Sequence, residues 1–133
     1  MAACYAPGAH FRDPAFGDLS GEEAGAMWRM LTSRATDLDV ELAEHDADGD
    51  RGSARWIATY TFTSTGRPVR NDVRASFRFG DGRIVEHEDR FSFWTWSRQA
   101  LGPIGTALGW SPVLRATVRR RARADLERFM AGE

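Results

Sequence analysis

The sequence predicts a single α+β domain built on a curved antiparallel sheet. Three observations lead to this prediction: an amphipathic helix near the N-terminus, several segments of alternating apolar and polar residues after it, and a second helical pattern at the C-terminus. Short turns join the alternating segments, and such turns are typical of antiparallel neighbours. The chain has 133 residues, which is enough for one domain with a modest core.

The first full helix has a clear start signal. Ser20 and Glu23 form a capping box, in which each side chain can bond the backbone N–H of the other residue. Apolar residues then follow at helical spacing, at Ala24, Met27, Trp28 and Leu31. We expect this helix to end near Ala35. Ahead of it, residues 1–6 are interpreted as the stub of another helix, and His10–Asp13 as a short strand.

The middle of the chain has the period-two pattern of strands with one buried face. The alternating segments are Leu38–Leu42, Trp56–Phe62, Val73–Phe79 and Val85–Phe93. Polar and glycine-rich stretches between them predict turns at Asp46–Gly52, Ser64–Arg67 and Gly80–Gly82.

The turn lengths predict how the last three strands pair. A three-residue loop at Gly80–Gly82 keeps Glu86 and Glu88 off the apolar face, whereas a two-residue loop would move them onto it. With the longer loop, three rows cross the apolar face: Trp56–Ala75–His87, Ala58–Val73–Asp89 and Tyr60–Asn71–Phe91. Titratable groups and an amide then lie among aromatic and small side chains, which predicts a pocket.

The last part of the chain differs in composition. Leu101–Trp110 is apolar and rich in glycine, and Ser111-Pro112 opens a helix with proline at the favoured first position. Its apolar stripe consists of Leu114, Val118, Ala122 and Leu126, and arginines fill the rest. We therefore separate a main unit, residues 1–97, from a C-terminal segment, residues 98–133, that packs on or extends the same domain.

Composition excludes several classes of function. The net charge is −1, so no overall field favours nucleic acid. All 18 basic residues are arginine, which excludes Schiff-base catalysis by lysine. Cys4 is the only cysteine, so no internal disulfide can form. One cysteine and three histidines also make a dedicated zinc site unexpected, and we expect neither a metal nor a cofactor. The sequence shows no signal peptide and no apolar run that could span a bilayer, and we expect a cytoplasmic protein.

Particular segments resemble a known superfamily. Tyr5–Gly17, the helix that carries Trp28, and Gly82–Asp89 resemble the nuclear transport factor 2-like superfamily, and Gly82–Asp89 is similar to SnoaL-like polyketide cyclases. The resemblance covers roughly residues 1–96. It implies a curved sheet wrapped into a cone around an apolar pocket, with helices on the concave side. The chain departs from the family in two places, where we expect a truncated first helix and an extra C-terminal helix.

The resemblance also implies roles for two aspartates. Asp89 matches the acid/base aspartate on the late strand of SnoaL-like cyclases. Asp13, which precedes Pro14, occupies the position of the general base of ketosteroid isomerases. Those isomerases also use a tyrosine from the first helix and an acidic residue, whose position here falls near Ala75, so their oxyanion site is not expected.

Asp89, His87 and Asp13 are therefore the candidate catalytic residues. A carboxylate on an apolar strand face should have a raised pKa, which suits a general base. The structural alternatives remain open: an ion pair of Asp89 with Arg12, Arg34 or Arg55, a core histidine at 87, and a turn cap at Asp13.

The candidate ligand-binding residues are those predicted to face the pocket: Trp28, Trp56, Tyr60, Asn71, Phe77, Phe91 and Phe93. Ordinary core packing is the alternative for each aromatic. Two functions follow from different classes. One is a cofactor-free isomerase, cyclase, dehydratase or hydrolase acting on an apolar small molecule, and the other is a non-catalytic ligand-binding or dimerisation module.

A homodimer is expected in either case, because the resemblance implies a dimer interface on the convex sheet face. That face should present Arg55, Arg74 and Arg78, interleaved with Ile57 and Thr59. The arginine-rich C-terminal helix is interpreted as a solvated face. Contact of the C-terminal segment with an anionic membrane is the alternative interpretation.

Overall fold

The fold is a six-stranded curved sheet with helices packed against it, seen in a computed structural model that describes residues 4–34, 37–62 and 64–133. The strands are β1 (Tyr5–Asp13), β2 (Gly17–Ser20), β3 (Asp39–Asp48), β4 (Arg51–Phe62), β5 (Arg67–Gly80) and β6 (Arg83–Arg90). The helices are α1 (Gly21–Arg34), α2 (Phe93–Leu101), α3 (Pro103–Leu108) and α4 (Pro112–Ala131).

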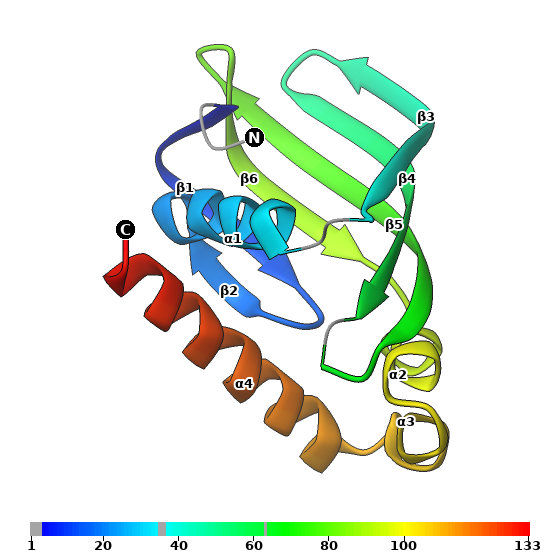
Figure 1. Cartoon of the computed structure of the whole chain (residues 1–133). Helices are drawn as coiled ribbons and strands as arrows, with labels where there is room; N and C mark the ends of the chain where they lie inside the picture. The colour runs from blue at the N-terminus through cyan, green and yellow to red at the C-terminus, as the bar shows by residue number, and fades with distance from the viewer. Residues whose placement is uncertain (1–3, 35–36, 63) are drawn as a thin grey trace.

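The strands lie in the order β2-β1-β6-β5-β4-β3, and the sheet does not close (Figure 1). The α+β prediction is confirmed. One detail of the antiparallel prediction is wrong, because β1 runs parallel to β6 while the other neighbours are antiparallel. The parallel pair joins strands that are far apart in the sequence, and no hairpin could connect them. Because β1 and β6 run in the same direction, their C-terminal ends lie side by side.

The predicted capping box begins α1. The backbone N–H of Ser20 donates to Glu23 Oε1 at 3.0 Å, and that of Glu23 donates to Ser20 Oγ at 3.1 Å. Ala24 and Met27 are fully buried against the concave side of the sheet. The predicted helix end at Ala35 lies outside the described residues.

The first strand is longer than predicted. The interpretation of residues 1–6 as a helix stub is wrong for Tyr5 and Ala6, which begin β1, and residues 1–3 lie outside the described ranges. Gly8 has a φ of 78°, and the pairing of β1 with β6 shifts between Tyr5 and His10. Tyr5, Ala9 and Phe11 are all buried.

The predicted register of β5 and β6 is wrong by two positions, although the buried face is right. Ala75 lies opposite Asp89 and Phe77 lies opposite His87. Asp81 and Gly82 both have positive φ, which fits a two-residue turn between Gly80 and Arg83. A two-residue turn alone would reverse the faces, but a one-residue irregularity between Arg78 and Phe79 restores them.

The pairing of β4 with β5 is also displaced by two positions from the predicted rows. Ala58 lies opposite Asn71, and Tyr60 lies opposite Val69. The strands start pairing at Phe62 and Arg67, so the connection between them is longer than the predicted Thr65-Gly66 loop. An even displacement leaves each side chain on its predicted face.

Two strand ends also differ from the prediction. The predicted turn at Asp46–Gly52 is shorter, because β3 and β4 stay paired as far as Asp48 and Arg51. The predicted strand Val85–Phe93 ends at Arg90, since Ser92 caps α2 by accepting a hydrogen bond from the backbone N–H of Thr95. Phe93 is therefore the first residue of a helix.

The C-terminal helix α4 packs on α1 and supplies a core residue. Ser111 caps it and Pro112 is its first residue, as predicted. Leu126 is 1% exposed within the main core cluster, and ion pairs join Arg123 to Glu23 and Glu133 to Arg29. Within the described ranges, none of the helices combines the length and apolar character needed to cross a bilayer.

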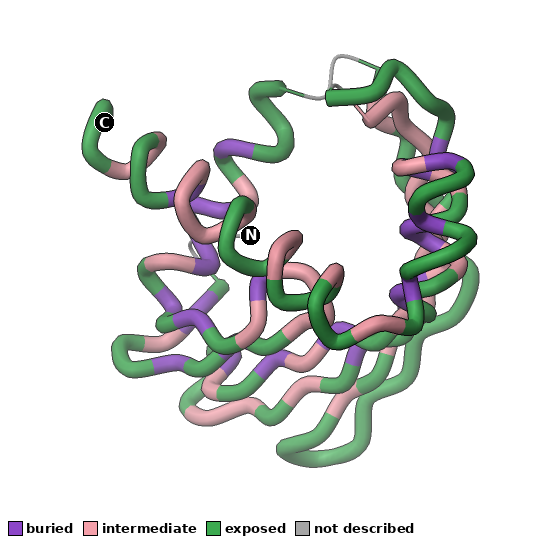
Figure 2. Tube along the Cα trace, turned by 90° about the horizontal axis from the view of Figure 1, so that it is seen from below, coloured by how far each residue is buried: buried purple, intermediate pink, exposed green. Residues whose placement is uncertain are grey.

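Buried residues gather in two places (Figure 2). The larger cluster joins α1, β1, β2 and Leu126. The smaller one joins the start of β5 to α2, through Val69, Phe93, Trp96 and Ala100. Toward the β3 edge of the sheet, most of β4 is half-buried and the whole of β3 is exposed.

The packing of α4 predicts that Leu126→Ala destabilises the protein by about 3 kcal/mol, because it leaves a cavity in the main core. Leu108→Ala, at a leucine that is 47% exposed, is the matched control and should cost less than about 1 kcal/mol. Urea unfolding of both variants measures the difference. Equal stabilities would contradict the placement of α4 in the core.

Candidate functional site

Two titratable side chains lie buried side by side on β6. His87 is 2% exposed and Asp89 is 5% exposed, and His87 Nε2 lies 2.6 Å from Asp89 Oδ1. On the other side of the imidazole, Nδ1 lies 2.8 Å from the hydroxyl oxygen of Tyr5 on β1. Their positions two residues apart on one strand place both groups on the concave face, as predicted.

A chain of hydrogen bonds fixes the direction of these contacts. Trp28 Nε1 donates to the Tyr5 hydroxyl at 3.0 Å. Burial raises the pKa of Tyr5 to about 12, so the hydroxyl stays protonated. Because this hydroxyl already accepts from Trp28, we assign it as the donor to His87 Nδ1. The ring proton of His87 is then on Nε2 and is donated to Asp89. Every donor in this relay, which consists of Trp28, Tyr5, His87 and Asp89, therefore points toward the carboxylate.

Aromatic rings hold the imidazole from several sides. The ring of Phe77 is centred 4.5 Å from that of His87, and the ring of Phe11 meets its face edge-on at 4.9 Å. Trp56 and Trp28 lie farther out, at 6.2 Å and 6.4 Å. This packing restricts rotation of the imidazole and excludes water from it.

The carboxyl of Asp89 is held at a raised pKa. Burial raises it, and the hydrogen bond and the charge interaction with His87 oppose the rise only in part. The alternative of an ion pair with arginine is not what the structure shows, because Arg12 pairs with Asp18 and Arg55 pairs with Asp72. Within the residues that the structure describes, Arg34 forms no ion pair either.

Asp13, at the end of β1, caps the following turn and also has a raised pKa. Its Oδ1 accepts hydrogen bonds from the backbone N–H groups of Ala15 and Phe16, at 2.9 Å and 2.5 Å, so it does cap the following turn. Burial nevertheless raises its pKa to about 6, since these bonds offset the burial only in part and the negative charge of Asp89 raises the pKa further. Asp13 and Asp89 are therefore an electrostatically coupled pair.

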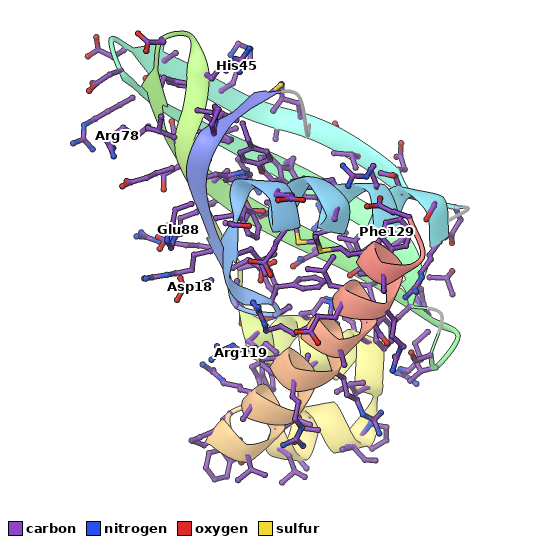
Figure 3. The ribbon with its side chains drawn as sticks, turned by 90° about the vertical axis from the view of Figure 1, so that its left-hand side faces the viewer. Asp18, His45, Arg78, Glu88, Arg119 and Phe129 are labelled. Carbon is purple, nitrogen blue, oxygen red and sulfur yellow. The ribbon has the colours of Figure 1, made fainter. Side chains whose placement is uncertain are left out.

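The two aspartates share a cavity of about 450 Å³ where β1 and β6 end. Charged side chains line the rest of it, including Arg12, Glu88 and Arg119. Figure 3 shows Asp18, Glu88 and Arg119 reaching the same side of the molecule from β2, β6 and α4.

Arg119 brings the C-terminal helix into this site. Its side chain lies over Gly17, where an added Cβ would meet Arg119 Cδ at 3.1 Å. Gly17 also has a φ of 75°, so the position favours glycine on two grounds. The absence of a side chain on Gly17 lets the guanidinium reach the cavity.

The remaining predicted ligand residues divide into two groups. Trp56, Tyr60, Asn71 and Phe77 are half-buried on the inner sheet face. Phe93, by contrast, is 3% exposed in the smaller core cluster, and Phe91 packs against that cluster.

Tyr60 has a hydroxyl that can serve a ligand. It accepts a hydrogen bond from Trp96 Nε1 at 2.9 Å, and among the described residues no acceptor takes its own proton. Burial raises the pKa of Tyr60, and so does the negative charge of Asp13, which places the two groups within electrostatic reach.

Two further apolar residues extend this face on β3. Val40 lies opposite Ala58 and Leu42 lies opposite Trp56, so both side chains share the concave side. They are 55% and 56% exposed. The concave face therefore presents uncovered apolar surface beside the buried relay.

Sequence reasoning missed Tyr5 and Arg119. The alternation of Ala9, Phe11 and Asp13 was a usable signal for a longer strand, but Tyr5 lies beyond an irregularity that alternation does not reveal. Arg119 reaches the cavity only because α4 folds back across α1, and no local pattern predicts that contact.

Comparison with known proteins identifies the family. The profile of the SnoaL-like domain matches residues 1–87, which is more than half of the chain. The chain belongs to the SnoaL-like domain family. Asp13, His87 and strand β5 of this SnoaL-like protein lie within the match, which ends inside β6, whereas Asp89 and Arg119 lie beyond it. Among curated proteins, no sequence matches this chain.

Solved structures share the fold of this SnoaL-like protein. A hypothetical protein from Catenulispora acidiphila with a ketosteroid isomerase-like fold, solved in complex with trimethylamine, is 17% identical over 84% of each chain, with a TM-score of 0.66. IdmH, a putative polyketide cyclase from Streptomyces antibioticus, is 23% identical over 71% of this chain and 79% of its own, with a TM-score of 0.59.

A putative SnoaL-like polyketide cyclase from a Jannaschia species is 17% identical over 76% of each chain, with a TM-score of 0.64. These likenesses establish the nuclear transport factor 2-like fold.

The raised pKa of Asp13 predicts a pH-dependent stability. Folding raises this pKa from 3.8 to about 6, so the contribution of Asp13 to stability is complete below about pH 4 and is lost as pH rises through about 6. Asp13→Asn keeps the oxygen that caps the turn and removes the buried charge. We expect a free energy of unfolding about 1–3 kcal/mol above wild type at pH 7, and less pH dependence between 4 and 7.

Urea unfolding at several pH values measures this effect. Asp48→Asn, on the exposed end of β3, is the matched control and should follow the wild type. A lower stability of Asp13→Asn than of wild type at pH 7 would show that the charge of Asp13 stabilises the fold.

Proposed function

We propose that this protein binds an apolar carbonyl compound on its concave face and transfers a proton at the carbon beside the carbonyl. Asp89 is the general base and Asp13 is the general acid. The observation that carries this proposal is the pair of coupled aspartates in one cavity, with one of them aimed by a buried hydrogen-bond relay.

The environments of the two aspartates separate their tasks. The hydrogen bond from His87 favours the ionised form of Asp89, which can accept a proton. The negative charge of Asp89 in turn favours the protonated form of Asp13. A pair of carboxyl groups whose pKa values are pushed apart is a common basis for acid/base assignments.

The relay keeps the base in position during the transfer. Rotation of the imidazole away from Asp89 would break its bonds to both Tyr5 and Asp89, so His87 is a positioning residue in this proposal. Oriented groups lower the barrier because less motion has to be restricted during the reaction.

Two side chains suit the substrate oxygen and its apolar body. The Tyr60 hydroxyl can donate to an oxygen that becomes negative, since its proton has no acceptor among the described residues. Trp56 and Phe77 supply apolar surface beside the relay. The reaction class includes isomerases, cyclases and dehydratases that use no cofactor, and names of structural neighbours such as putative polyketide cyclase agree with it.

A second candidate function is that of a ligand carrier or dimerisation module. The observation that favours it is the exposure of Val40 and Leu42, each more than half exposed on the concave side. A bulky apolar ligand or a second copy of the chain would cover this surface.

The proposal is tested with 2-tetralone, an apolar bicyclic ketone with acidic protons beside its carbonyl. We expect the protein to accelerate exchange of these protons in D2O, followed by NMR, and the rate to fall as pH rises through about 6, where Asp13 loses its proton. Asp89→Asn should lower the rate by about 10²–10⁴-fold, the usual share of a general base.

Asp48→Asn is again the matched control and should exchange at the wild-type rate. Exchange no faster than in buffer, together with binding of the ketone, would favour the carrier function. Exchange that survives Asp89→Asn would contradict the assignment of the base.

A further inference from the structure

The chain is electrostatically divided. Residues 90–124 contain seven arginines and no aspartate or glutamate, while the remaining residues contain eleven arginines and all 19 acidic residues. The basic stretch forms α2, α3 and the first part of α4. A net charge of −1 for the whole chain therefore hides a strongly cationic region beside a strongly anionic one.

The same stretch carries the three most exposed large apolar side chains of the described residues, Ile104 (62% exposed), Trp110 (67%) and Val113 (75%). With Leu108 (47%), we call them the α3–α4 corner. Figure 1 shows this corner at the lower end of the molecule, away from the β3–β4 and β5–β6 turns.

Backbone contacts hold the corner in shape. Trp110 Nε1 donates to the carbonyl oxygen of Ala107 at 2.8 Å. The backbone N–H of Ser111 donates to the carbonyl oxygen of Leu108, also at 2.8 Å. The nearby Trp94 donates from Nε1 to the carbonyl oxygen of Thr106 at 3.1 Å. The indole N–H groups are thus satisfied, and the rings present apolar surface to the outside.

Arginines lie on α2 and α4, the helices before and after α3. Arg98 lies over the ring of Trp94 at 5.0 Å, and Arg115 lies over the ring of Phe93 at 5.4 Å. Both are exposed, as are Arg120 and Arg121 on α4, and none of the four makes an ion pair with any residue in the described ranges. Their charges are therefore available to an outside partner.

We propose that the α3–α4 corner docks on the surface of an anionic lipid bilayer. Its apolar side chains would enter the boundary between headgroups and acyl chains, and the arginines around it would contact lipid phosphates and carboxylates. This mode needs no spanning helix. It goes beyond the proposed function and does not depend on it.

Charge argues against the other occupants. A second copy of the chain placed symmetrically on the corner would bring two acid-free arginine clusters together, which costs energy instead of gaining it. A nucleic acid would meet the arginines but would leave the apolar corner uncovered. An anionic bilayer is complementary to both features.

Docking would also place the cavity that holds Asp13 and Asp89 close to the lipid. Arg119, which lines that cavity, is six residues from Val113 on α4, or about 9 Å along the helix axis. An apolar compound dissolved in the bilayer would therefore have a short path to the concave face.

The test is flotation of the full chain with vesicles of phosphatidylcholine alone and of phosphatidylcholine with phosphatidylserine. We expect flotation only with the anionic vesicles, and weaker flotation at high salt. Arg120→Gln with Arg121→Gln should weaken binding by about tenfold or more, since each arginine near an anionic surface contributes measurably. Ile104→Ser with Trp110→Ser should weaken it at least as much.

Each pair of changes has a matched control. Arg74→Gln with Arg83→Gln removes the same charge from exposed positions on β5 and β6, and Val40→Ser with Leu42→Ser removes exposed apolar surface from β3. Both controls should bind like the wild type. Circular dichroism and thermal unfolding confirm that all variants are folded.

Several results would overturn the proposal. They are no flotation with anionic vesicles, binding that survives loss of Ile104 and Trp110, and equal losses in the controls. A change from dimer to monomer in the Ile104→Ser, Trp110→Ser variant, seen by light scattering, would assign the corner to a second copy of the chain instead.

Discussion

The hydrogen bond between His87 and Asp89 is the interaction on which the site depends. A carboxyl that is 5% exposed needs a donor, since an unpaired buried charge is strongly unfavourable. In a neutral imidazole one nitrogen donates and the other accepts, so a hydroxyl of Tyr5 that donates to Nδ1 favours the tautomer in which Nε2 donates to Asp89. Tyr5 reaches it because β1 lies parallel to β6, and α1 adds Trp28 behind the Tyr5 hydroxyl. The position of the Asp89 carboxyl group therefore depends both on the pairing of β1 with β6 and on the position of α1.

The region after the SnoaL-like match gives this chain its individual features. The match ends at residue 87, yet α4 adds Leu126 to the core and Arg119 to the cavity beside the aspartates. The same region carries the acid-free stretch and its exposed corner. Conclusions about the substrate therefore depend as much on α2–α4 as on the shared domain.

Sequence reasoning placed the key groups on the correct face but not opposite the correct partners. Alternation is sensitive to parity, so His87 and Asp89 were expected inside and they are inside. Alternation does not change when a strand is displaced by two residues against its neighbour. It therefore cannot distinguish a two-residue turn followed by an irregularity near Arg78 from a regular three-residue turn. The end of β6 was missed because Phe91 and Phe93 continue the alternation, while the cap at Ser92 begins a helix.

The contacts that make the site specific come from distant parts of the chain. Tyr5 and His87 are 82 positions apart, and Arg119 meets Gly17 only after α4 has packed on α1. Local patterns carry no information on such contacts, whereas the capping box at Ser20 and Glu23, which is entirely local, was predicted in full.

The most direct test of this account is the free energy of unfolding of Asp89→Asn near pH 7. The amide oxygen can still accept from His87, and the cost of burying the charge disappears, so we expect the variant to be as stable as wild type or more stable. A loss of more than about 2 kcal/mol would contradict the account. It would show that the charge of Asp89 serves mainly to hold the fold together.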